Sequence, residues 1–214
     1  MSKKMMVLAL AVVSAAFFAL PAMASALEDH LEPAEKFTVS GSGGELRTSG
    51  EPTITCTETT GTGEPSSSTT GFGVLTFGQC HATVFGITAA CKSEGSAVSN
   101  QISNKGTYHI ITDKVSGAVA TLFTTEKTVV VCAGISKITV TGSVIGTITS
   151  PKCGESSKTV TISYAATEST QNHLTYTGVK YDLLAKTGEG ENKTSAIVGT
   201  ATNTQANAAK LVCT

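Results

Sequence analysis

The sequence predicts an all-β protein, an antiparallel β-sandwich or barrel of about a dozen short strands held together by disulfides. Threonine accounts for 35 of the 214 residues, whereas aromatic residues make up 5% and charged residues 14%. Apolar and polar residues alternate in many short runs, which is the period of a half-buried strand. Six cysteines, an even number, follow a segment with the features of an export signal. Together these observations favour a small exported β-domain over a helical or intracellular one.

The first 24 residues have the pattern of a cleaved signal peptide. Two lysines precede an apolar run from Val7 to Leu20, and the small-residue pattern Ala22-Met23-Ala24 follows. This run is shorter than the roughly 20 residues that cross a bilayer, so we expect cleavage rather than a membrane anchor. We expect the cut after Ala24, with a second possible cut after Ala26, and no membrane span in the mature chain. The protein is then secreted and extracellular, or associated with the cell envelope.

Residues 25–36 form the most charged segment and precede any clear strand pattern. We predict a charged N-terminal tail here, either mobile or one short helix, and a single β-sandwich domain over residues 37–214. Without the two lysines of the signal, the net charge is −3 with histidine neutral. That balance weighs against a nucleic-acid partner, whose phosphates require a basic face.

Alternation predicts the strands in order along this domain. Val160, Ile162 and Tyr164 share one face of residues 159–164, and Ile138 and Val140 share one face of residues 138–141. Similar runs are residues 72–77, 82–90, 107–112, 117–123, 128–132, 144–149, 174–177, 179–184, 194–201 and 209–213. Gly61–Gly73 and Thr187–Thr194 are predicted to be long loops, because Gly, Ser and charged residues gather there.

The six cysteines predict three disulfides, for which fifteen pairings are possible. Cys80 and Cys91 bracket a predicted hairpin that turns near Gly86, so we expect them to be bonded to each other. We expect Cys132 to pair with Cys153 across a turn near Gly142 or Gly146. The remaining pair, Cys56 with Cys213, would join the first core strand to the last.

No catalytic, cofactor-binding or metal-ligating residue is predicted. The chain contains no Cys-x-x-Cys, no paired-histidine spacing, no Gly-x-Ser-x-Gly and no phosphate-binding glycine loop. His30, His81, His109 and His173 are widely separated, and each is expected to be structural or exposed. Glu189, Glu191 and Asn192 form a close polar cluster, for which a solvated loop tip is favoured over a weak calcium site.

Exposed Thr-x-Thr runs, such as Thr139-Val140-Thr141 and Thr147-Ile148-Thr149, suggest ice binding as an alternative. Ice-binding solenoids align such rows through a regular repeat, and no repeat is present. A carbohydrate-binding module is a further alternative, but such modules stack sugars on exposed aromatic rings, and this chain has no tryptophan.

Four segments, Cys56–Glu64, Phe72–Cys80, Gly142–Glu155 and His173–Leu183, carry a resemblance to a known group. Through them the chain resembles a group of uncharacterised secreted proteins of soil actinobacteria. The resemblance spans most of the chain after the signal. It implies export and a cysteine-stapled β-rich domain, and it implies no activity, ligand or catalytic residue.

These observations lead us to expect a non-enzymatic extracellular or cell-envelope domain with a structural or adhesive role. Its partners would be cell-wall or extracellular polysaccharide, or a protein surface. The alternative from another class is an extracellular hydrolase whose site is assembled from residues far apart in sequence. A close pair of buried carboxylates, or a histidine beside a carboxylate in a cleft, would favour that alternative.

Overall fold

The computed structural model describes residues 28–84, 86–113, 116–133, 137–172, 175–176 and 179–214, and these contain strands and no helix. The predicted signal peptide lies outside the described residues. Every strand pairing is antiparallel, which confirms the predicted fold class. The strands are β1 (His30–Glu32), β2 (Phe37–Thr48), β3 (Ile54–Cys56), β4 (Glu58–Pro65), β5 (Thr70–Gly78), β6 (His81–Val84), β7 (Ile87–Ser93), β8 (Ile102–Thr112), β9 (Val119–Cys132), β10 (Lys137–Ser150), β11 (Ser156–Tyr164), β12 (Ala166–Thr167), β13 (Thr170–Gln171), β14 (Thr175–Tyr176), β15 (Val179–Lys180), β16 (Leu183–Thr187) and β17 (Lys193–Val212).

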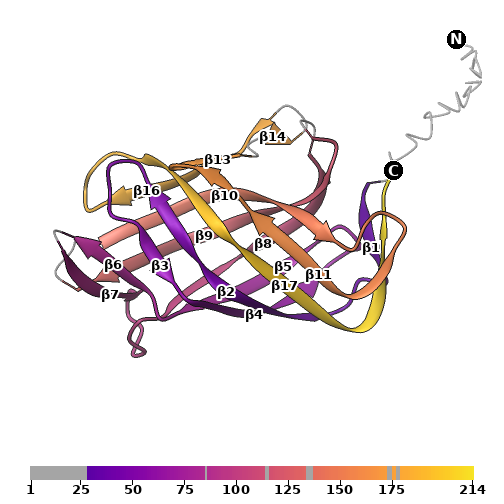
Figure 1. Cartoon of the computed structure of the whole chain (residues 1–214), viewed down its shortest axis with the longest axis horizontal. Coiled ribbons are helices and arrows are strands. Elements are labelled where there is room, and N and C mark those ends of the chain that lie inside the picture. Colours follow the sequence, from indigo (N-terminus) through magenta and orange to yellow (C-terminus); the bar gives the residue numbers. More distant parts are fainter. Residues whose placement is uncertain (1–27, 85, 114–115, 134–136, 173–174, 177–178) are drawn as a thin grey trace, which may run out of the picture.

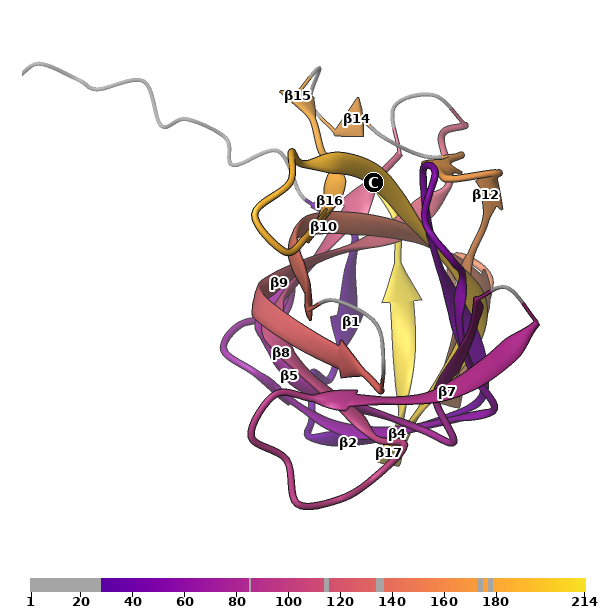
Figure 2. The same ribbon diagram turned by 90° about the vertical axis from the view of Figure 1, so that its left-hand side faces the viewer.

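Eight of these strands close into a barrel, the second of the two architectures that the sequence left open. Pairing runs in the order β2, β4, β5, β8, β9, β10, β11 and β17, and β17 then pairs with β2. Closure leaves no exposed edge strand in this ring. We call it the cavity ring. Figure 2 looks along the barrel and shows the strands surrounding its axis.

A second closed ring continues from the first along the same axis (Figure 1). The four long strands β2, β9, β10 and β17 run through both rings. In the second ring, β3, β6 and β7 join β2 to β9 in place of β4, β5 and β8, and β16 joins β10 to β17 in place of β11. We call it the disulfide ring, because it contains two of the three disulfides.

The switch from one ring to the other leaves part of β10 without a strand on the side away from β9. This strand pairs with β16 up to Gly142 and with β11 from Thr147 onward. The Gln171 side chain fills the gap: its Nε2 donates to the Ser143 carbonyl at 3.0 Å, and its Oε1 accepts from the Ile145 N–H at 3.3 Å. Gln171 is buried and thus replaces the missing backbone partner.

Residues 28–36, which we call the strap, lie against the end of the cavity ring. The sequence predicted a mobile tail or a short helix here, but His30–Glu32 forms β1 and pairs with the end of β17. Leu31 packs against the buried cluster that contains Ile110, Ile148 and Val160. A core-facing leucine and an available β17 edge explain why this charged segment is a strand.

The three disulfides join Cys56 to Cys80, Cys91 to Cys132 and Cys153 to Cys213. Three disulfides were predicted, but all three expected pairings, Cys80 with Cys91, Cys132 with Cys153 and Cys56 with Cys213, are wrong.

The expected hairpin does form, since β6 pairs with β7 around Gly86, and the Cys91 N–H donates to the Cys80 carbonyl at 2.9 Å. Each of these two cysteines is nevertheless bonded to a strand outside the hairpin, Cys80 to Cys56 on β3 and Cys91 to Cys132 on β9. The four sulfurs therefore fasten a row of adjacent strands, β3, β6, β7 and β9.

The other two predicted bridges fail because β10 is not a hairpin. It runs without reversal from Lys137 to Ser150, and Gly142 occupies a bulge in it rather than a turn. Cys132 and Cys153 therefore lie towards opposite ends of the barrel. Cys153 instead binds Cys213, which ties the β10–β11 connection to the end of β17.

Candidate ligand cavity

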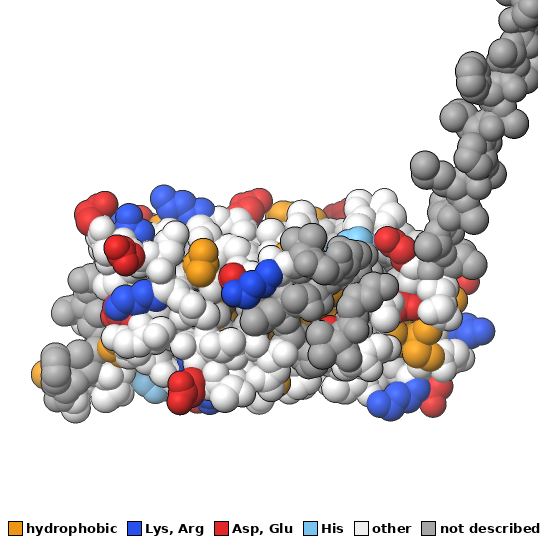
Figure 3. All heavy atoms as spheres, turned by 90° about the horizontal axis from the view of Figure 1, so that it is seen from above, with side chains coloured by type: hydrophobic (Ala, Val, Ile, Leu, Met, Phe, Trp, Pro, Cys, Tyr) orange, Lys and Arg blue, Asp and Glu red, His pale blue; other side chains and the backbone are white. Residues whose placement is uncertain are grey.

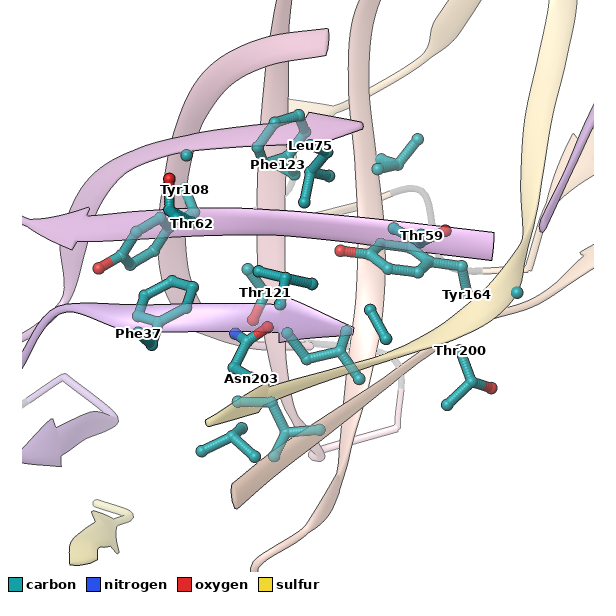
Figure 4. A pocket seen from close by; sticks show the side chains of 18 of the residues that line it. Phe37, Thr59, Thr62, Leu75, Tyr108, Thr121, Phe123, Tyr164, Thr200 and Asn203 are labelled. Carbon is teal, nitrogen blue, oxygen red and sulfur yellow. The ribbon is translucent and has the colours of Figure 1, made fainter. Parts of the chain in front are cut away.

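The cavity ring surrounds a partly open cavity of about 100 Å³, which the sequence did not predict. Its walls are mainly apolar, and residues of the strap close one end of it. Figure 4 shows side chains from several strands projecting into this space. The lining includes Leu31, Val39, Leu75, Ile110, Phe123, Val144, Ile148, Val160, Ile162 and Ile197.

Glycines at inward positions leave room for rings that neighbouring strands supply. Gly63, Gly73 and Gly106 lie opposite one another on β4, β5 and β8. A Cβ at Gly63 would be 2.0 Å from Phe37, and one at Gly106 would be 2.8 Å from Phe123. Gly61–Gly73, predicted as a long loop, is mostly strand, and Gly63, Gly71 and Gly73 within it face the rings of Phe37, Tyr108 and Phe123.

Tyr164 reaches into the cavity across Gly146. Alternation along β11 places Tyr164 on the inner face with Val160 and Ile162, as predicted. Gly146 on β10 is flanked by Thr121 on β9, and a Cβ on it would be 2.6 Å from Tyr164 Cε1. Burial raises the pKa of Tyr164 to about 12, so its hydroxyl is protonated at neutral pH.

Several polar groups in the cavity wall have no hydrogen-bond partner among the described residues. They include the hydroxyls of Thr121 and Tyr164 and the amide of Asn203. Figure 4 shows these three side chains directed towards the same space. Oε1 of Gln205, a residue that is 5% exposed, is likewise unpaired. Because buried polar groups are normally hydrogen-bonded, the unpaired Gln205 oxygen distinguishes the cavity from a purely apolar packing defect.

Glu35 of the strap is the single charged residue among the described residues that line the cavity. Both of its carboxylate oxygens accept hydrogen bonds from Asn207, one from the backbone N–H at 3.2 Å and one from Nδ2 at 2.8 Å. The carboxylate is thus used to hold the strap against β17. No cationic side chain belongs to the described lining.

The histidines do not meet in one site within the described residues. His109 Nε2 lies 3.3 Å from Glu28 Oε2, and neither residue belongs to the cavity lining. His30 and His81 bond through their rings to nearby backbone carbonyls, of Glu28 and Gln79. His173 lies outside the described residues.

The buried carboxylates are engaged in structure. Asp29 accepts hydrogen bonds from the Thr112 hydroxyl at 2.5 Å and from the Thr214 N–H at 2.9 Å. Asp113 accepts bonds from the Ser116 N–H and hydroxyl and so stabilises a turn. Glu189 is fully exposed and 3.7 Å from Lys186, as expected of a solvated loop tip. No group of three or more potential metal ligands occurs within the described part of the chain.

Comparison with protein-family models, with curated proteins and with solved structures found no match to this chain. Over the described residues, no helix combines the length and apolar character needed to span a membrane. The face in Figure 3 is dominated by uncharged polar side chains and backbone, with charged groups scattered among them. The interior of the barrel is where an apolar cavity and an unpaired buried polar group occur together.

Proposed function

We propose that this protein is exported and that it binds, without catalysing a reaction, a small apolar molecule inside the cavity ring. An eight-stranded barrel is just wide enough to be filled by its own side chains or to hold one small ligand. The disulfide ring is filled by its own side chains, which include Ile54, Val130 and the four cystine sulfurs. The cavity ring leaves room for one small ligand. Its apolar cavity, with unpaired polar groups in the wall, is the observation that carries the proposal.

Export is the part of the proposal that explains the cysteines. All six are in disulfides, which persist in oxidising compartments. N-terminal sequencing of the protein recovered from culture medium tests this step. A mature chain that begins at Ser25 or Leu27 is expected, and recovery of the uncleaved chain inside cells would contradict it.

Toluene is a suitable probe for ligand binding, because it has the size and apolar character of the space. Titration of the oxidised mature protein should give saturable chemical-shift changes at methyl groups that line the cavity. Ala201 faces inward beside Ile162, so Ala201→Leu should fill part of the cavity and weaken toluene binding. Its matched control is Thr202→Leu on the outward face of the same strand. Absence of saturable toluene binding to the wild-type protein would refute the proposal.

A surface role remains a second candidate, and one observation favours it. Hydroxyl side chains on six adjacent strands are in register across the outside of the cavity ring: Thr161, Thr202, Ser40, Thr60, Thr76 and Ser103. Such a row could hydrogen-bond to polysaccharide or to a protein surface. Because it follows the curved wall of a barrel, it suits an ice lattice less well. Cosedimentation with cell-wall polysaccharide tests this candidate, with saturable pelleting as the supporting result.

A further inference from the structure

We infer that the ligand of the cavity is an uncharged, compact molecule, mainly apolar, that carries a hydroxyl group. This inference rests on the proposed binding function and adds the chemical class of the ligand. It follows from three properties of the cavity: the polar groups in its wall, the lack of an available charge, and its volume.

The polar groups in the cavity wall favour a ligand group that can both donate and accept hydrogen bonds. Thr121 is 6% exposed and Gln205 is 5% exposed, yet neither side-chain oxygen is hydrogen-bonded to a described residue. The Tyr164 hydroxyl reaches towards Thr121 across Gly146 (Figure 4). A ligand hydroxyl donates one hydrogen bond and accepts others, so it can satisfy Gln205 or pair with either wall hydroxyl.

The wall offers no compensation for a charged ligand. Transfer of a carboxylate or an ammonium into an apolar cavity is costly unless an opposite charge pairs with it. The described lining contains no Lys, Arg or His, and the one carboxylate, Glu35, is held by Asn207. Fatty acids and amines are therefore disfavoured relative to neutral alcohols and phenols.

The volume limits the apolar part of the ligand. An engineered apolar cavity of about 150 Å³ holds benzene. The present cavity, at about 100 Å³, accommodates a ligand of similar or smaller size. Phenol combines this size with one hydroxyl group, and toluene has nearly the same shape without it.

The test compares phenol, toluene, pentanoate and pentylammonium as ligands of the oxidised mature protein, by calorimetry or NMR titration at neutral pH. Phenol is expected to bind at least as tightly as toluene. A wholly apolar cavity would prefer toluene, because its wall would leave the hydroxyl of phenol buried without a hydrogen-bond partner. Neither charged probe is expected to bind measurably. Tyr164→Phe and Thr121→Val should each weaken phenol binding about 3- to 10-fold and leave toluene binding unchanged. Thr202→Val, on the outer face, is the matched control and should alter neither.

The possible failures are distinguishable. If toluene binds but phenol binds more than about tenfold more weakly, the hydroxyl inference is overturned and the proposed binding function stands. If pentanoate or pentylammonium binds as tightly as phenol, the inference of an uncharged ligand is overturned. If toluene does not bind, the proposed function fails and the inference that rests on it fails as well. Retained toluene binding by Tyr164→Phe and Thr121→Val shows that these variants still fold.

Discussion

The ring of Tyr164 occupies the space that a side chain on Gly146 would need. The two residues lie on neighbouring strands, and a Cβ at position 146 would be 2.6 Å from Tyr164 Cε1 and 2.6 Å from Ile162 Cγ2. The absence of a side chain at Gly146 therefore sets the position of the Tyr164 hydroxyl in the cavity.

Gly146→Ala should displace Tyr164 and destabilise the fold by about 1–3 kcal/mol, the usual cost of an overpacked core. Gly73→Ala is the matched control, because a Cβ there would meet its nearest atom, on Phe123, at an ordinary 3.5 Å. Urea denaturation of the two variants measures the difference. Equal stabilities would show that Tyr164 does not depend on Gly146 for its position.

Gln171→Leu should lower the free energy of unfolding by about 2–5 kcal/mol, because it leaves the Ser143 carbonyl and the Ile145 N–H buried without a partner. Gln101→Leu makes the same chemical change at a half-buried side chain that has no hydrogen bond to a described residue, so a change within about 0.5 kcal/mol is expected. Thermal unfolding of both variants provides the measurement. A Gln171→Leu protein as stable as the control would mean that another group replaces the amide.

Peptide mapping without reduction should recover the pairs Cys56–Cys80, Cys91–Cys132 and Cys153–Cys213. Replacement of both Cys91 and Cys132 by alanine should cost about 4 kcal/mol in the chain-entropy model, given their separation of 41 residues. Peptides that link Cys80 to Cys91 would contradict the structure.

Alkaline pH should destabilise the protein through Tyr164. Burial raises its pKa in the fold to about 12, whereas the unfolded chain ionises this group near 10. The unfolded state therefore loses the proton first. Stability is complete below about pH 10 and falls by about 1.4 kcal/mol per pH unit until about pH 12.

Denaturation of the wild type and of Tyr164→Phe across this pH range checks the sign, since the variant should lose less stability. Burial also raises the pKa of Tyr108 to about 12, so a spectrophotometric titration should show this residue ionising late in both proteins. A Tyr164→Phe protein with the alkaline profile of the wild type would remove Tyr164 as the cause.

Local alternation in the sequence predicted several of the strands and which of their residues share a buried face. Ile138, Val140, Val160 and Ile162 are buried as expected, and the hairpin at Gly86 forms. Each of these features depends on neighbours within a few residues, which a pattern of period two records.

The disulfides and the cavity depend on contacts that the sequence does not record locally. Cys80 faces Cys91 across the hairpin as predicted, but bonding depends on β3 and β9, which the closure of a ring brings alongside. The cavity likewise depends on side chains from strands far apart in the sequence, such as Phe37, Phe123 and Tyr164, which line the same space. The spacing of Gly61, Gly63, Gly71 and Gly73 is compatible with strands, and the loop predicted over this segment is wrong at residues 61–65 and 70–73.

The cavity and the cystine-bonded strands share one hydrophobic core. Leu75, Phe77 and Tyr108 line the cavity and also pack against the buried cluster that contains the four cysteines of the disulfide ring. Strands β4, β5, β8 and β11 line the cavity and take no part in the disulfide ring. Substitutions in their inward residues therefore change the cavity and the packing against the cystine-bonded strands together. Ligand preference and the stability of the fold are linked through the same side chains.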